Sequence, residues 1–388
     1  MKKRNLRLFY LHELFFQFSD SMLVVVTPVF LYKLTNSISA VFVFIFLWNA
    51  IHSIIFIPVF NLAMKLKKPK LFMIFGVLFY ITSQLLLGST TSDNLYLLIP
   101  AVFTFACYVS FYWMIKHWFF SVNVDLERMG KQMSMIGIIR MLISFIAPIT
   151  AGLLSYFISF NSTYLLGAGA SICGLIPILL FYAPPHTENI NFRKILKTMK
   201  IPEVKAIRFA FYSEGALFTT LLQSWMLIFA IYIGSILDLG LLIGVTTLVT
   251  SLAIWLAGHW FDKRKRTTLL TRLSNLRTLC LMLYISIFFN KHLAYVWLIE
   301  FINRLAFEMQ RNVSDSYLYS YSQKINPAEI PLIREFYINL GRLSLSLMLA
   351  ITFYFLPKDF LWIVLFLSSF FALGISTMKR SDHLLHQR

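Results

Sequence analysis

Residues 37–64 read SISAVFVFIFLWNAIHSIIFIPVFNLAM, a long apolar run without Asp, Glu, Lys or Arg. A helix needs about 20 mostly apolar residues to cross the hydrocarbon core of a bilayer, so this run is long enough to span it. Inside hydrocarbon the backbone must satisfy its own hydrogen bonds, and a helix does so within a single segment. The stretch therefore predicts a transmembrane helix.

Similar apolar stretches fill most of the 388 residues. We predict an all-α integral membrane protein with 12 transmembrane helices. The predicted spans are residues 8–32, 37–64, 71–87, 95–120, 133–158, 163–182, 206–233, 240–261, 269–289, 294–318, 333–356 and 360–378.

Composition excludes an ordinary soluble protein. The chain is 58% hydrophobic and 13% charged, whereas soluble domains carry about 25% charged residues. A net charge of +18 would suit nucleic-acid binding, but the basic residues gather in alternate connections. Only Lys33, Lys291 and Lys358 fall in connections on the predicted outer side. This asymmetry predicts a protein of the cell membrane with both termini in the cytoplasm, basic contacts to anionic lipid headgroups, and no nucleic-acid partner.

Metal and cofactor chemistry has no sequence support. Cys107, Cys173 and Cys280 all lie inside apolar stretches without paired spacing, and the 8 histidines are scattered. We expect no disulfide and no metal site. We find no phosphate-binding loop and no hydrolase motif, so we expect no catalytic residues, no cofactor and no enzymatic activity.

One long polar connection divides the chain. Residues 183–203 (APPHTENINFRKILKTMKIPE) are basic and lie near its middle. Six spans before such a linker and six after it predict two bundles, at 1–183 and 206–378. A cytoplasmic linker at 184–205 and a cytoplasmic tail at 379–388 complete the predicted organisation. An ordinary long loop is the simpler interpretation of the same stretch.

A short motif follows the predicted span 240–261. It reads Gly258-His-Trp-Phe-Asp262-Lys-Arg-Lys-Arg266, and the matching positions are Gly258, Asp262, Lys263 and Arg266. The chain thereby resembles the major facilitator superfamily, where Gly-x-x-x-Asp-Arg/Lys-x-x-Arg/Lys follows the second helix of each half. Glycine lets helices approach closely, and a carboxylate at a helix end can receive helix-dipole and arginine contacts. These positions are therefore candidates for a latch between the bundles.

Two further stretches match family patterns only in part. Residues 61–70 (NLAMKLKKPK) keep the basic run of the motif but have Asn61 for glycine and Lys65 for aspartate. Their basic charge is explained by the positive-inside rule alone. Residues 147–152 (APITAG) are similar to a loose form of the Gly-Pro-x-x-Gly-Gly element of facilitator antiporters. A proline kink beside small packing residues explains them equally well.

Ionisable residues inside the spans indicate where function lies, because a charge in hydrocarbon is costly. Most of them fall in 8–32, 95–120, 206–233 and 294–318. The resemblance implies that these four spans line a central cavity. In 294–318 the charged residues recur every three or four positions, and so share one helix face. They are Glu300, Arg304, Glu308, Arg311 and Asp315.

This charged stripe must face water, the bundle interior or opposite charges. Arg304 and Glu308 lie near the predicted membrane middle and are candidate solute contacts. The alternative is a self-neutralising ladder that only keeps one wall of the cavity polar. A carboxylate removed from water holds a proton more readily, so Asp20, Glu214 and Glu308 are candidate proton carriers and cavity residues. Each of them could equally form a static salt bridge.

The span 95–120 supplies Tyr112, Lys116 and His117 as further cavity candidates. His117 could titrate near neutral pH. Lys116 lies at about the depth of Glu13, and a pair between them could close an inner gate. A snorkelling lysine among interfacial aromatic rings is the alternative.

Three more residues are candidates for structural pairing between the bundles. Glu335 and Arg342 lie two turns apart on one face of 333–356, and Arg140 lies inside 133–158. The alternative role is capture of an anionic substrate by Arg140, Arg304 and Arg342.

These features predict a secondary active transporter that moves a small solute by alternating access and is coupled to protons. Its expected partners are the solute, protons and the lipid bilayer, and it is expected to be a monomer. The first alternative is a multidrug or lipid exporter of the same fold, favoured by 39 Phe and 18 Tyr. The second is a non-transporting scaffold or receptor, against which the buried charges argue.

Overall fold

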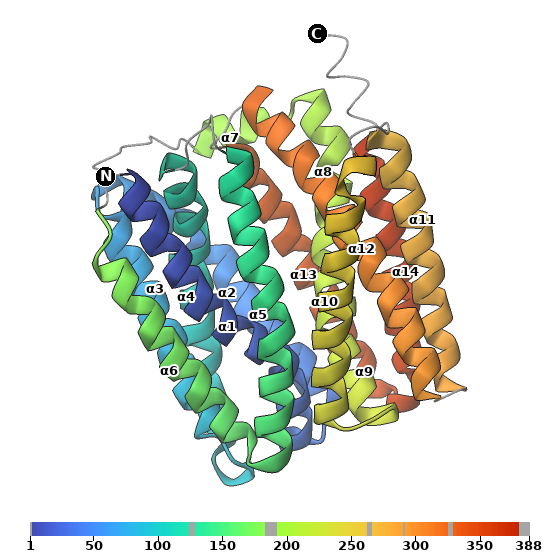
Figure 1. The fold of residues 1–388 in the computed structure, drawn as a ribbon. Helices are drawn as coiled ribbons and strands as arrows, with labels where there is room; N and C mark the ends of the chain where they lie inside the picture. Colours follow the sequence, from blue (N-terminus) through green and yellow to red (C-terminus); the bar gives the residue numbers. More distant parts are fainter. Residues whose placement is uncertain are drawn as a thin grey trace. The chain divides into compact units, whose positions relative to one another are not determined.

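The computed structural model describes residues 2–123, 129–182, 192–261, 266–289, 292–324 and 329–379. Within these ranges the backbone alone is described at 2–3, 120–123, 129–138, 192–194, 253–261, 266–267, 316 and 318–324. Every regular element in the described ranges is helical (Figure 1). The all-α class is therefore as the apolar runs predict.

The first part of the chain forms α1 (Lys2–Thr35), α2 (Ile38–Lys65), α3 (Pro69–Gly88), α4 (Leu98–Asn123), α5 (Met129–Phe157) and α6 (Phe160–Leu179). The later part forms α7 (Phe192–Thr198), α8 (Pro202–Leu217), α9 (Ser224–Tyr232), α10 (Ile236–Phe261), α11 (Arg266–Ile285), α12 (Leu293–Lys324), α13 (Glu329–Phe355) and α14 (Trp362–Ile375). Short 3₁₀ turns precede α4 and α14 and follow α11 and α14.

Nine helical stretches within the described residues are long and apolar enough to cross a membrane. The apolar part of α10, Ile236–Leu252, is shorter. Neither α11 nor α12 is among the nine, because α11 carries Arg272 and Arg277 and α12 carries the charged stripe. The chain is thus a multi-pass membrane protein, while the count of 12 spans stays a prediction.

Contacts within the chain define two compact units. Unit 1 comprises residues 1–37, 47–189 and 234–245, and unit 2 comprises residues 38–46, 190–233 and 246–388. In unit 1, α1 packs on α5 and α6, and α3 packs on α4 and α6. In unit 2, α8 packs on α13 and α14, and α11 packs on α12 and α14. The division into two six-helix bundles, joined by a linker at residues 184–205, stays a prediction.

The helices α2 and α10 each contribute to both units. In unit 2, the first turns of α2 pack on α13, where the Phe42 and Phe353 rings stack at 5.9 Å. In unit 1, the first turns of α10 pack on α5. A Cβ atom added to Gly240 would lie 3.2 Å from Gly152 Cα, so glycine at both positions permits the close approach. Gly152 of the stretch 147–152 therefore has a packing role, and likeness to the antiporter element stays a prediction.

The predicted span 206–233 is not one regular helix. It consists of α8 and α9 with a π-helical turn, Phe218–Gln223, between them. A π turn adds a residue to the helical repeat and occurs often at functional sites. Thr220 Oγ1 donates to the Ala216 carbonyl at 2.9 Å and Ser224 Oγ donates to the Thr219 carbonyl at 3.2 Å. Hydroxyl groups thus satisfy backbone acceptors around the irregular turn.

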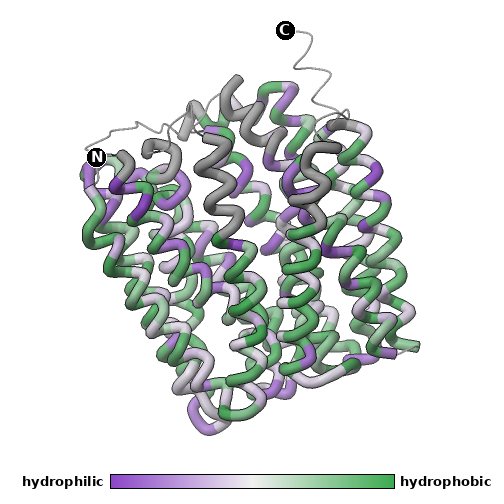
Figure 2. Tube along the Cα trace, viewed as in Figure 1, coloured by the Kyte–Doolittle hydropathy of each residue, from purple (hydrophilic) through white to green (hydrophobic). Residues whose placement is uncertain are grey.

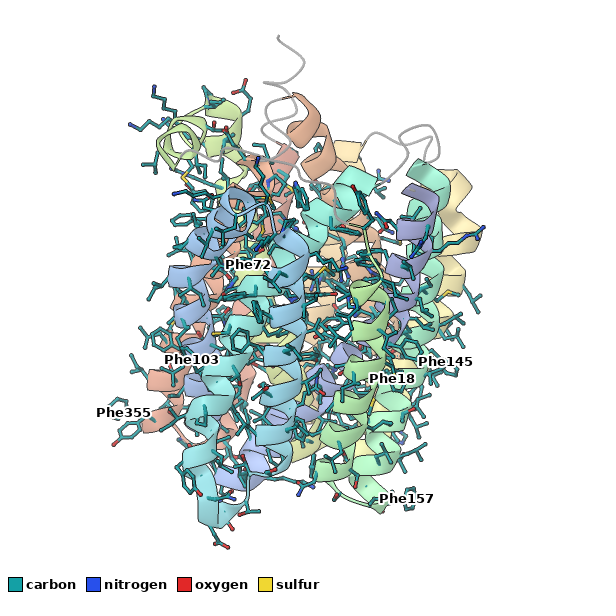
Figure 3. All side chains as sticks on the ribbon, turned by 90° about the vertical axis from the view of Figure 1, so that its left-hand side faces the viewer. Phe18, Phe72, Phe103, Phe145, Phe157 and Phe355 are labelled. Carbon is teal, nitrogen blue, oxygen red and sulfur yellow. The ribbon has the colours of Figure 1, made fainter. Side chains whose placement is uncertain are left out.

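Apolar side chains cover the outer faces of the helices. Hydrophobic residues run along most helices, and hydrophilic residues gather near many of their ends (Figure 2). Phe103 and Phe157 in unit 1 and Phe355 in unit 2 point away from the helices that carry them (Figure 3). Exposure of large apolar side chains on this scale suits a hydrocarbon solvent rather than water.

Candidate functional site

A buried ion pair joins α1 to α4 in unit 1. Lys116 Nζ lies 2.8 Å from Glu13 Oε1, and both side chains are almost completely buried. Lys116 Nζ also lies 4.5 Å from the centroid of the Trp113 ring, which provides a cation–π contact. The structure thus brings together the two residues that the sequence places at the same depth.

Two further side chains extend this ion pair into a buried polar cluster. Tyr112 Oη lies 3.4 Å from Glu13 Oε1 and 2.6 Å from His12 Nε2. The other ring nitrogen, His12 Nδ1, lies 2.8 Å from the Gly174 carbonyl oxygen on α6. Both His12 and Tyr112 are fully buried. The cluster therefore connects α1, α4 and α6.

The sequence pattern does not single out His12 as a functional residue. Scattered histidines give no metal-ligand spacing, and a neutral imidazole does not stand out as a charge does. The usable signal is its position directly before Glu13 in an apolar run, because a polar group buried there needs hydrogen-bond partners.

Asp20 lies two turns farther along α1 and is held by neutral donors. Tyr80 of α3 and Tyr108 of α4 each donate to Asp20 Oδ1 at 3.4 Å. The two phenol rings stack at 4.2 Å. Asp20 is half-buried and has no ion pair among the residues that the structure describes. Long hydrogen bonds from hydroxyl groups leave room for a change of protonation at this carboxylate.

Aromatic rings fill the space between the two acidic residues of α1. Phe16 stacks on Tyr112 at 4.3 Å and contacts Tyr80 at 5.2 Å and Tyr108 at 5.8 Å. All four rings are buried. Unit 1 therefore combines a few buried charges with closely packed aromatic rings. The low local dielectric of such surroundings strengthens the electrostatic interaction between those charges.

In unit 2 the best-defined charge pair lies within α12. Arg304 donates from Nε at 3.0 Å and from Nη2 at 2.8 Å to Glu300 Oε1. Tyr284 of α11 donates to Glu300 Oε2. Glu300 is buried and Arg304 is mostly buried. Glu300 and Arg304 thus neutralise each other across one helical turn, while a ladder along the whole stripe stays a prediction.

The middle of the stripe differs from its start. Glu308 is half-buried and forms no hydrogen bond or ion pair within the described part of the chain. Its charge acts on two arginines, Arg277 of α11 and Arg304. Arg277 is 3% exposed and donates from Nη1 to Gln310 Oε1 at 2.7 Å. Arg277 thus has an amide as its hydrogen-bond partner, and the charges of Glu308 and Glu214 act on it.

Glu214 takes part in a charge network near the stripe's other end. Arg334 of α13 forms an ion pair with Glu214 of α8 and lies 3.7 Å from Asp315 Oδ1 of α12. All three side chains remain partly exposed. The network joins three helices of unit 2, so Glu214 has the static salt bridge that the sequence analysis gave as its alternative role.

Glu335 and Arg342 contact each other along α13, with Nη1 and Oε1 3.5 Å apart. The Arg342 guanidinium lies 4.4 Å from the centroid of the Phe218 ring. Phe218 is the first residue of the π turn, so α13 and this irregular segment are linked by a cation–π contact. A role for the two charged residues between bundles stays a prediction.

The remaining candidates take no part in the ion pairs above, or they lie outside the residues that the structure describes. Arg140 of α5 is half-buried, and its charge acts on Glu13 and Lys116. His117 is exposed, with its ring 6.0 Å from that of Trp113.

Asp262 and Lys263, two residues of the predicted latch, lie outside the described residues. Gly258 lies in α10 and Arg266 begins α11, both without described side chains, so the latch stays a prediction. In the described residues, no group of three or more His, Cys, Asp or Glu is placed to hold a metal ion.

Comparison with known proteins adds a family and a fold. The family model described as Major Facilitator Superfamily matches residues 10–324. No curated protein matches the chain.

Among solved structures, the chain is similar to a peptide transporter POT in complex with sulfate, at 11% identity and a TM-score of 0.74, covering 98% of this chain and 94% of that one. It is also similar to a POT family transporter in complex with 5-aminolevulinic acid, at 12% identity and a TM-score of 0.74, covering 96% and 94%. A POT family transporter in complex with a thioalcohol-conjugated peptide matches at 12% identity and a TM-score of 0.71, covering 99% and 96%. At such identities the likeness concerns the fold.

Proposed function

The chain belongs to the major facilitator superfamily, and on this premise we propose that it is a proton-coupled secondary active transporter of a small polar solute. It works by alternating access, in which the two predicted halves of the chain, residues 1–183 and 206–378, rock and expose a solute site first to one side and then to the other. Its place is the cell membrane, with both termini in the cytoplasm.

The observation that carries this proposal is the buried Glu13–Lys116 ion pair. A pair taken out of water often stabilises a fold less than apolar side chains of the same volume would. Its presence inside a membrane-spanning unit therefore favours use in binding or conformational change over use as packing. Glu13 and Lys116 both belong to unit 1, and the closing of an inner gate by this pair stays a prediction.

The contacts also rank the candidate proton carriers. Glu214 is held by Arg334 in an ion pair, which protonation of the carboxylate would break. Asp20 is held by two phenols and Glu308 by no direct contact in the described residues. A carboxylate without a contacting cation can change its charge without breaking an ion pair. We therefore place Asp20 and Glu308 ahead of Glu214 as proton carriers.

Purified protein in proteoliposomes with an imposed pH gradient tests the proposal. A panel of radiolabelled amino acids, short peptides and small organic acids identifies the solute through gradient-driven accumulation. Asp20→Asn or Glu308→Gln is expected to abolish accumulation, while exchange of solute at equal pH continues. Glu214→Gln serves as the matched control, with accumulation reduced less. Full accumulation in both Asp20→Asn and Glu308→Gln contradicts the assignment.

A second candidate function is export of aromatic or apolar compounds. The rings of Phe16, Tyr80, Tyr108 and Tyr112 in unit 1 favour it, because buried aromatic faces bind other π systems. Efflux of a fluorescent lipophilic dye, with no accumulation of any polar solute in the panel, would select this function. Absence of both activities in well-folded protein would leave the scaffold role.

A further inference from the structure

The imidazole of His12 belongs to the Glu13–Lys116 cluster and has no part in the transport mechanism proposed above. It is fully buried on α1, with the rings of Phe16 at 5.2 Å and Phe9 at 6.5 Å. The groups that act on it are Glu13 of its own helix, Tyr112 and Lys116 of α4, and the Gly174 carbonyl of α6. Arg140 of α5 acts on the same ion pair.

The partners of the two ring nitrogens fix the tautomer of the neutral imidazole. A carbonyl oxygen only accepts hydrogen bonds, so the 2.8 Å contact to Gly174 requires the hydrogen on Nδ1. Nε2 then carries the lone pair, and Tyr112 Oη donates to it at 2.6 Å. The Tyr112 hydroxyl hydrogen is thereby directed toward His12 and away from Glu13.

Adding a proton to His12 reverses that direction. With hydrogen on both nitrogens, Nε2 donates to Tyr112 Oη, and the tyrosine hydrogen turns to Glu13 Oε1, which lies 3.4 Å away. Glu13 then faces the ammonium of Lys116, a newly donating phenol and a second cation on His12, the residue before it in α1. Each added partner competes for the same carboxylate and weakens its hold on Lys116.

We propose that His12 is a proton-holding residue that controls the Glu13–Lys116 ion pair through the hydroxyl of Tyr112. This inference rests on the proposed proton-coupled transport. A proton on the Glu13 carboxyl passes to Tyr112 Oη while the hydrogen of Tyr112 passes to His12 Nε2. One O–H bond of Glu13 and one of Tyr112 break, and one Tyr112 O–H bond and the Nε2–H bond form. The tyrosine is regenerated, Glu13 returns from the carboxylic acid to the carboxylate, and His12 gains the positive charge.

The link to conformational change follows from burial. A second buried cation beside Lys116 and near Arg140 is unfavourable in the closed cluster. His12 therefore holds its proton in a conformation that admits water or separates Lys116 from Glu13, and loading the proton shifts the protein toward that conformation. Trp113 offers the released ammonium a π face at 4.5 Å.

The first test separates coupling from transport. His12→Gln retains an amide that can donate to Gly174 but binds no proton in the working pH range. Reconstituted His12→Gln is expected to keep equilibrium exchange of the identified solute and to lose gradient-driven accumulation by about tenfold or more, the scale on which a positioned proton carrier acts. His292→Gln, a change at an exposed histidine, is the matched control and should accumulate solute as the unmodified protein does. Accumulation at the unmodified level in His12→Gln overturns the proposal.

The second test reads the proton on His12 directly and does not depend on transport. Full-length protein with ¹³C,¹⁵N-labelled histidine in nanodiscs is titrated by NMR, and the signal missing from His12→Gln identifies the residue. We expect this signal to titrate, and to shift its midpoint in Glu13→Gln by an amount equal to about a tenfold change in proton affinity. A His12 signal that stays in one tautomer across the whole range, with or without Glu13, overturns the proposal.

The two tests also keep this inference apart from the proposed function. If the unmodified protein accumulates no solute under a pH gradient, proton-coupled transport fails while the NMR titration still decides whether His12 holds a proton. If His12→Gln does not fold, Tyr112→Phe replaces it. That variant keeps the Gly174 contact and removes only the link to Glu13, so it should uncouple accumulation from the gradient in the same way.

Discussion

The charge pairs of the two units differ in how they are built. In unit 1, Glu13 and Lys116 come from α1 and α4, far apart in the sequence. In unit 2, Glu300 and Arg304 lie one turn apart on α12. A pair within one helix forms whenever that helix forms, whereas a pair between helices forms only when the helices pack. The Glu13–Lys116 pair therefore responds to movement of one helix against another, as does the partly exposed Glu214–Arg334 pair of unit 2, whereas the Glu300–Arg304 pair does not.

The largest expected effect breaks the pair in unit 1. Lys116→Met leaves Glu13 buried without its cation and is expected to lower the free energy of unfolding by about 3–5 kcal/mol. Thermal unfolding in detergent measures the loss. Adding Glu13→Gln should recover part of it, because the orphaned charge is then removed. Lys33→Met, at an exposed lysine over the Phe160 ring, is the control and should cost about 1 kcal/mol or less.

Arg304→Met applies the same change to the pair in unit 2. Glu300 keeps its hydrogen bond from Tyr284, so the expected loss is about 1–3 kcal/mol, the range for removing one partner of a charged hydrogen bond. An equal loss in Arg304→Met and Lys116→Met would remove the distinction between the two units.

A close glycine contact in unit 2 allows the packing of the two units to be compared. A Cβ atom added to Gly341 of α13 would lie 2.8 Å from Ala216 N, which is backbone of α8. Gly341→Ala is expected to destabilise the protein by about 1–3 kcal/mol, because backbone atoms move less readily than side chains. Gly169→Ala on α6 is the matched control, since nothing lies within 4 Å of its added Cβ, and it should be neutral or stabilise by about 0.5–1 kcal/mol. Similar unfolding temperatures for the two variants would show that α8 and α13 are less closely packed than the 2.8 Å distance implies.

The smallest expected effect concerns the phenols around Asp20. Tyr80→Phe or Tyr108→Phe removes one 3.4 Å hydrogen bond and should cost about 0.5–1.5 kcal/mol. The pH profile of solute flux should move toward higher pH in both, because losing a donor to the carboxylate favours its protonated form. Tyr164→Phe, whose hydroxyl contacts Thr27, is the control with an unchanged profile. A profile that stays fixed in both variants counts against Asp20 as a proton carrier.

The sequence locates the charged residues well and their partners poorly. A glutamate at position 13 in an apolar run is conspicuous, and its likeness in depth to Lys116 already suggests a pair. His12, one residue earlier, gives no comparable signal, because its partners are the Gly174 carbonyl and the Tyr112 hydroxyl, more than 90 residues away along the chain. Likewise, nothing in the sequence around Glu214 predicts that it pairs with Arg334. The π turn at Phe218 has no distinct residue pattern either.

By itself the sequence determined that this chain is helical and crosses the membrane, because long apolar runs leave the backbone no other way to satisfy its hydrogen bonds. It also determined the Glu300–Arg304 contact, since the helical repeat places residues four apart on one face. Only the tertiary structure decided that Glu13 meets Lys116, that Tyr112 lies between Glu13 and His12, and that Arg334 meets Glu214. Those contacts depend on how helices pack and rotate against one another, and close packing of many small contacts sets that geometry.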